Sequence, residues 1–100
     1  MGDEEEEARG LKMAKPKIGA RKVTTKPEML VDVNPHRKAL LIYNNGTATV
    51  ELLSSKDGRY GDGIPILAGA QYDNKNYCQG AYWIIAESGT QDIRFEEDVD

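Results

Sequence analysis

The sequence predicts an all-β fold: a small antiparallel β-sandwich or barrel of about seven short strands, preceded by an extended N-terminal arm. Three observations support this prediction. Short segments rich in apolar and β-branched residues recur at close intervals between residues 18 and 96, turns rich in Gly, Asn and Asp separate them, and no segment of this body has the apolar spacing of a helix. A chain of 100 residues is enough for one domain.

The clearest predicted element is a β-hairpin. Residues 39–43 form an apolar run, and residues 47–53 alternate between apolar and polar side chains, with Glu51 on the polar face. The Asn-Asn-Gly sequence between the two runs contains residue types that tolerate the positive φ of a type I′ turn. We therefore expect these two runs to pair as neighbouring strands.

The remaining strands are expected at residues 18–25, 29–33, 64–67, 71–72, 80–86 and 91–96. Pro65 cannot donate to a ladder, so its strand belongs at an edge. Residues 80–86 are apolar on both faces, which favours a central strand covered on both sides or a lateral contact. In the last strand Ile93 and Phe95 are expected to point inward, while Asp92, Arg94 and Glu96 point outward. The predicted core consists of Val31, Val33, Leu40, Ile42, Val50, Leu52, Ile66, Leu67, Trp83, Ile85, Ile93 and Phe95.

The chain divides into a charged arm at residues 1–16, a β-sandwich domain at 17–97 and an acidic end at 98–100. Residues 3–7 are all acidic, whereas residues 9–26 contain Lys and Arg but no acid. Two interpretations of the arm stay open: a disordered tail, or an arm that becomes ordered by lying on a neighbouring subunit.

Charge and composition argue against several partners. The formal net charge of −4 disfavours duplex nucleic acid, and the scattered tyrosines with Trp83 are expected to serve packing rather than to stack on single strands. No stretch is long and apolar enough for a membrane span, and the N-terminus does not resemble a secretory signal. A single cysteine, Cys78, excludes an internal disulfide.

The candidate catalytic and metal-binding residues form no recognisable constellation. His36 lies in a proline turn with no acid nearby, and Cys78 is expected to be a small buried residue. Asp57 and Asp62 supply too few oxygens for a calcium loop. The sequence therefore predicts a protein that is not an enzyme and that has no cofactor or metal site.

Four pieces of the body, in order, resemble small β-sandwich structural proteins associated with the capsids of tailed bacteriophages. They are residues 34–42 (NPHRKALLI), 44–50 (NNGTATV), 63–69 (GIPILAG) and 80–94 (GAYWIIAESGTQDIR). The resemblance implies a decoration or cementing protein, made in the host cytoplasm, that binds the outside of the head and bridges coat subunits without catalysis. It implies that the partners are the major capsid protein and neighbouring copies of the chain, as a homo-oligomer on the particle. The arm departs from the family pattern, which usually begins close to the first strand.

The arm supplies the predicted partner-binding residues, because ordering it requires apolar anchors or paired charges. Two alternatives to decoration stay open. One is a minor protein of the head–tail junction or a fibre, and the other is a carbohydrate- or receptor-binding module that uses Tyr60 in the loop 56–63, or residues 72–77. The predicted partner-binding residues are Arg9, Leu11, Lys12, Met13, Lys15, Lys17 and Ile18.

Overall fold

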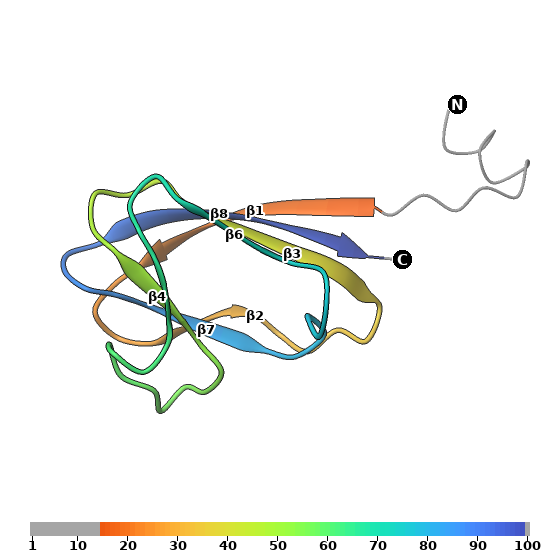
Figure 1. Ribbon diagram of the computed structural model, residues 1–100, viewed down its shortest axis with the longest axis horizontal. Helices are drawn as coiled ribbons and strands as arrows, with labels where there is room; N and C mark the ends of the chain where they lie inside the picture. The colour runs from red at the N-terminus through yellow and green to blue at the C-terminus, as the bar shows by residue number, and fades with distance from the viewer. Residues whose placement is uncertain (1–14, 100) are drawn as a thin grey trace, which may run out of the picture.

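The computed structural model describes residues 15–99 and arranges them as eight β-strands in two four-stranded antiparallel sheets, which confirms the predicted all-β sandwich (Figure 1). Sheet A has the order β1 (Lys15–Val23), β8 (Gln91–Val99), β3 (Arg37–Asn44) and β6 (Gln71–Asn74). Sheet B has the order β2 (Glu28–Val31), β7 (Tyr82–Ala86), β4 (Val50–Leu53) and β5 (Ile64–Ile66).

The connections between strands define the topology. Every connection crosses from one sheet to the other except the one between β4 and β5, which are neighbours in sheet B. This eight-stranded arrangement of two Greek keys is the jelly roll. β1 begins and β8 ends on the same side of the molecule, because Lys15 lies opposite Val99 (Figure 1). We call this side, where residues 1–14 join the fold, the arm end.

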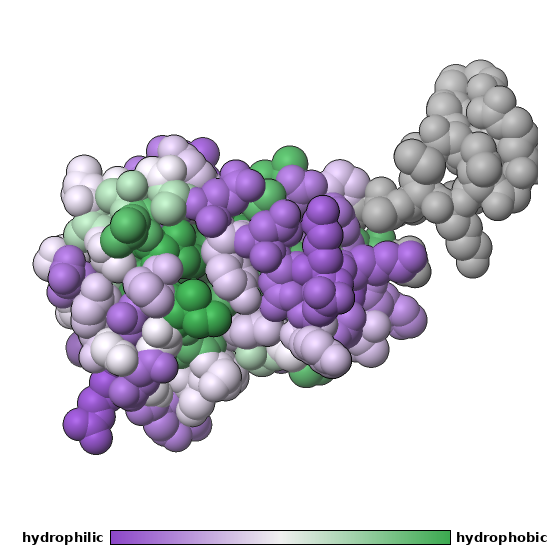
Figure 2. Space-filling model, in the orientation of Figure 1, coloured by the Kyte–Doolittle hydropathy of each residue, from purple (hydrophilic) through white to green (hydrophobic). Residues whose placement is uncertain are grey.

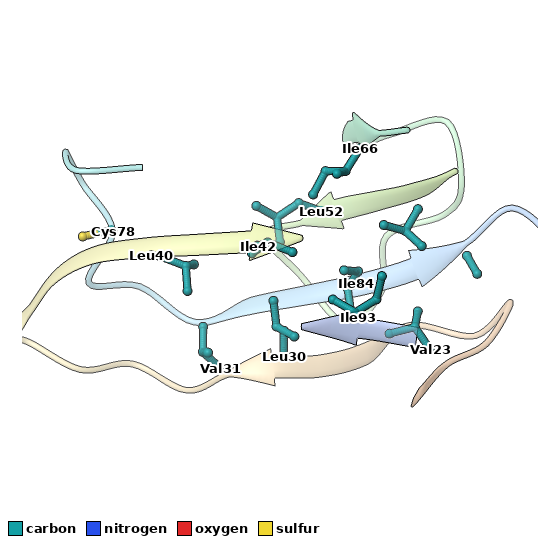
Figure 3. Close-up of a cluster of buried hydrophobic side chains, with 12 residues drawn as sticks. Val23, Leu30, Val31, Leu40, Ile42, Leu52, Ile66, Cys78, Ile84 and Ile93 are labelled. Atoms are coloured by element: carbon teal, nitrogen blue, oxygen red, sulfur yellow. The ribbon is translucent and has the colours of Figure 1, made fainter. Parts of the chain in front are cut away.

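The hydrophobic core fills the space between the sheets (Figure 3). Seven of the twelve predicted core residues belong to it, and Phe95 packs against it while partly buried. Val33 and Leu67 lie just beyond the ends of short strands and are 65% and 62% exposed, and Trp83 and Ile85 of β7 are also outside the cluster. Pro65 lies in β5, which pairs only with β4 among the described strands and is therefore an edge strand as predicted. The cluster is made of Val23, Leu30, Val31, Leu40, Ile42, Val50, Leu52, Ile66, Cys78, Ile84, Ala86 and Ile93.

The predicted hairpin is wrong, because β3 and β4 belong to different sheets. Asn44 is fully buried, and its amide Nδ2 donates to the carbonyls of Ala48 and Ile66, each at 2.9 Å. Its Oδ1 accepts a hydrogen bond from the backbone N–H of Gly46 at 2.9 Å. These three bonds stabilise a wider connection that takes the chain across the sandwich, in place of a two-residue turn.

Gly46 in this connection has a steric role. A Cβ at this position would lie 2.2 Å from Oε1 of the buried Gln91. That oxygen accepts hydrogen bonds from the backbone N–H groups of Thr47 at 2.7 Å and Ala48 at 3.2 Å. Glycine is therefore required here for close approach, and its φ is not in the left-handed region.

β7 is central in sheet B, between β2 and β4, as its apolar composition predicted. The inward-facing set differs from the expected one: Ile84 and Ala86 belong to the core cluster, so Trp83 and Ile85 point to the outer side of the sheet. Ile85 is nevertheless only 5% exposed. Glu51 lies opposite Ile85 and faces the outer side of the sheet as expected, but it is buried there, at 6% exposed.

Candidate interaction surface

The predicted partner-binding residues that the structure describes lie on β1. Lys15 is the first residue of this strand, and Lys17 and Ile18 follow within it. Arg9, Leu11, Lys12 and Met13 lie outside the described residues. Among the described strands β1 pairs only with β8, so its other side is an open edge of sheet A.

The outer face of sheet A carries an ordered row of side chains across all four strands. Ile18 lies opposite Glu96, Glu96 lies opposite Leu41, and Leu41 lies opposite Asp73. Paired residues of neighbouring strands share a face. Ile18, at 79% exposed, therefore stands beside an acidic side chain on an uncovered sheet surface.

A shallow hollow of about 190 Å³ opens on this face toward the arm end. Its apolar part comes from β3 and its charged part from β6 and β8 and the residue after β6. Three carboxylates and one ammonium group surround it, so its formal charge is 3 negative against 1 positive. We call it the sheet A hollow; its lining residues are Ala39, Leu41, Asp73, Lys75, Glu96 and Asp98.

At the far end of the same face, the Asp92 carboxylate already has partners. The Arg94 guanidinium donates to the Asp92 carboxylate, with Nη2 to Oδ2 at 2.8 Å, and Asn45 donates to the same oxygen at 3.0 Å. Together these hydrogen bonds, Arg94 first, lower the pKa of Asp92 to about 2. The excess negative charge of the face therefore belongs to the hollow and not to Asp92.

Arg37 organises the loops of the arm end. It is 1% exposed, and its Nε donates to Glu97 Oε2 at 2.8 Å. Its Nη1 donates to the carbonyls of Cys78 at 2.7 Å and Gly80 at 2.8 Å, and its Nη2 donates to the carbonyl of Asp32. One guanidinium thus ties β3 to β8 and to the loops before β3 and β7.

The same loops contain the residues considered for catalysis. Cys78 is fully buried as predicted, and its Sγ donates to the Arg37 carbonyl at 3.6 Å. His36 is exposed in the turn before β3, where its backbone N–H donates to Asn34 Oδ1 at 3.0 Å. Tyr77 is 92% exposed with a φ of 53°. Nothing in this geometry joins a nucleophile to a base.

The loop at residues 54–63 covers part of the outer face of sheet B. Glu51 Oε1 accepts hydrogen bonds from the backbone N–H groups of Gly61 at 2.6 Å and Gly63 at 3.2 Å. Leu53 is 4% exposed under this loop, where a Cβ on Gly58 would lie 3.1 Å from its Cδ2. A buried carboxylate that binds the loop backbone thus explains the exposures of Glu51 and Leu53.

The acids rejected as a calcium loop and the tyrosines considered for glycan binding lie as follows. Asp62 Oδ2 accepts from the Arg59 N–H at 3.1 Å, and within residues 15–99 no group of three or more His, Cys, Asp or Glu is placed to hold a metal ion. Tyr60 is 38% exposed, and partial burial, with Glu87 and Glu51 nearby, raises the pKa of its phenol. Tyr72 is partly buried against the core, whereas Tyr77 is 92% exposed.

One face of the molecule is divided by polarity. In the view of Figure 2, hydrophilic side chains cover the half toward the arm end and hydrophobic side chains gather in the half around β4. At the β5 edge, Ile64 is 49% exposed and Leu67 is 62% exposed. No helix long and apolar enough to span a membrane occurs among the described residues.

Sequence reasoning found β1 and missed the buried polar residues Arg37, Asn44 and Glu51. It also missed the sheet A hollow. The outward positions of Arg94 and Glu96 were predicted from alternation and are confirmed. Asp73 and Glu96 lie on either side of β3 because β3 lies between β6 and β8 in sheet A. The local sequence carries no signal for that strand order.

We compared the chain with protein-family models, curated proteins and solved structures, and none of them matches it.

Proposed function

We propose that this chain is a structural protein of a phage virion: a capsid decoration or cementing protein that binds the outside of the head and bridges coat subunits. The resemblance of four sequence segments supports this, and so does the jelly roll, an architecture that includes viral capsid domains. Lectin domains and cupins share this architecture, so the fold alone does not select the function. The observation that carries the proposal is the place of β1, an open basic edge strand that begins where the arm joins the fold.

An open edge strand is a docking site for another extended chain. Its unpaired N–H and C=O groups can accept a segment of the coat protein as a further strand of sheet A. Lys17 and Lys22 are exposed on β1 and favour an acidic segment. They disfavour pairing of β1 with β1 of another copy, because like charges would then lie opposite each other.

Co-sedimentation with capsids that lack the protein tests the proposal. We compare the full chain with Ile18→Glu on β1 and with Leu67→Glu, a matched control of similar exposure at the β5 edge. Ile18→Glu is expected to weaken binding at least about tenfold, a loss of roughly 1.4 kcal/mol, while Leu67→Glu binds as the wild type does. Equal binding of both variants would remove β1 from the interface, and no binding of the wild type would refute the proposal.

The number of copies bound at saturation separates decoration from its closest alternative. Hundreds of copies per particle indicate decoration, whereas a handful indicates the head–tail junction or a fibre. If the wild-type chain does not bind, a glycan array with wild type and Tyr60→Ala tests the carbohydrate-binding alternative.

A further inference from the structure

The sheet A hollow is a surface distinct from the β1 edge. It lies on the sheet face, not along the strand edge, and its charge has the opposite sign to that of β1. The apolar side chains of Ala39 and Leu41 are flanked by the carboxylates of Asp73, Glu96 and Asp98. A segment that fits here combines apolar side chains with positive charge.

The chain itself contains such a segment. Residues 9–14 read Arg-Gly-Leu-Lys-Met-Ala, with two cations, two large apolar side chains and no acid. We propose that residues 9–14 of one copy dock in the sheet A hollow of a second copy, which links the two copies through their arm ends. The link deepens the proposed function and rests on it for its biological setting, because copies held side by side on a capsid meet at high effective concentration.

The direction of the chain at the arm end favours a second copy over the same copy. β1 begins at Lys15, and Lys15 precedes Pro16. The residue before a proline is held in the extended region, which disfavours a reversal of the chain at Lys15. Six extended residues span roughly 20 Å, enough to reach a neighbouring molecule without a reversal of the chain. Docking in its own hollow requires a reversal directly before Lys15.

The charges of the face also favour this occupant. Asp92 is already paired with Arg94 and Asn45, whereas the hollow has three carboxylates and Lys75 as its only cation. Arg9 and Lys12 would add the positive charge that the hollow lacks. The contact is partly electrostatic and solvent-exposed, so it weakens as salt shortens the screening length.

Disulfide trapping between two single-cysteine variants of the full chain tests the proposal. Met13→Cys on one preparation is mixed with Ala39→Cys on another, and the rate of covalent dimer formation is measured under mild oxidation. The control mixture pairs Met13→Cys with Ser55→Cys, an exposed position in the loop at residues 54–63. The native Cys78 is fully buried and is the same in every sample.

We expect the Met13→Cys and Ala39→Cys mixture to dimerise at least about fivefold faster than the control, and to lose this advantage between about 0.05 M and about 0.5 M salt. Asp73→Lys combined with Ala39→Cys is expected to remove it as well. A rate equal to that of the control overturns the proposal. So does a double variant, Met13→Cys with Ala39→Cys in one chain, that gives only an internal disulfide.

The outcomes separate this proposal from the proposed function. Cross-linking takes place in solution without capsids, whereas co-sedimentation does not require contact between copies. Trapped dimers without capsid binding would refute only the decoration proposal. Capsid binding by a chain that gives no trapped dimer would refute only the proposed link between copies.

Discussion

Replacement of Arg37 by methionine is expected to destabilise the domain more than any change on its surface. Methionine keeps much of the aliphatic volume but removes four hydrogen bonds: one to the Glu97 carboxylate and three to the carbonyls of Asp32, Cys78 and Gly80. A buried acceptor left without a partner costs about 1–3 kcal/mol. The Glu97 side chain is 15% exposed, so water reaches part of its carboxylate and reduces the cost of leaving that carboxylate unpaired.

The expected loss is therefore about 3–5 kcal/mol, which is typical when one partner of a buried ion pair is removed. Native domains have total stabilities of about 5–15 kcal/mol, so Arg37→Met removes a large part of the free energy of unfolding. Urea unfolding followed by Trp83 fluorescence measures the change as a shift of the midpoint at constant slope.

Two further variants separate charge from geometry. Arg37→Lys keeps the positive charge but lacks the fork that reaches several acceptors at once, so we expect it to remain destabilised by about 2 kcal/mol or more. Glu97→Gln keeps an acceptor for Nε and is expected to cost less than Arg37→Met. A free energy of unfolding for Arg37→Met within about 1 kcal/mol of the wild type would refute the structural role of this guanidinium.

Three other predictions follow from the geometry. Gly46→Ala should lower the free energy of unfolding in urea by about 1–3 kcal/mol, because the added Cβ would lie 2.2 Å from Gln91 Oε1. Gly61→Ser is the control: a Cβ at Gly61 meets nothing within 4 Å, so any loss of stability there comes from its φ of 106° and not from a clash. Because the folded-state pKa of Asp92 is lowered to about 2, its contribution to stability is present above the unfolded pKa of about 4 and is lost as pH falls toward 2. An NMR titration checks this: Arg94→Gln should raise the Asp92 pKa, and an unchanged value would contradict the assigned cause. Asp73→Asn with Glu96→Gln should leave the free energy of unfolding within about 0.5 kcal/mol of the wild type, since both residues line an open surface, and a larger loss would show that the fold needs these carboxylates.

The fold class could be predicted from the sequence because alternation and turn composition are local properties. The last strand shows this well: Ile93 is buried, while Arg94 and Glu96 face outward as expected. The hairpin prediction was wrong because it considered only the backbone preferences of Asn and Gly. The conformation of the connection between β3 and β4 depends on Ile66 and Gln91, which are distant in sequence and form hydrogen bonds with this connection.

The candidate surface was predictable only in part, for the same physical reason. Lys17 and Ile18 stood out in the sequence because β1 lies in a basic stretch without acids. The hollow unites residues of β3, β6 and β8, and only the strand order of sheet A brings Asp73 near Glu96. Arg37 lies just before the predicted hairpin, and its burial depends on acceptors more than forty residues away.

The polar side chains of this protein fall into two groups with different roles. Arg37, Asn44 and Gln91 are buried, and no buried side-chain nitrogen or oxygen among residues 15–99 lacks a hydrogen-bond partner. These residues stabilise the crossings between the sheets. The acids of the sheet A hollow do not, because the alternation of β6 and β8 requires only that outward residues be polar. Three carboxylates and one ammonium group line this apolar hollow, so its excess negative charge attracts a further cation. Under the proposed link between copies, interaction and stability should therefore respond to different substitutions.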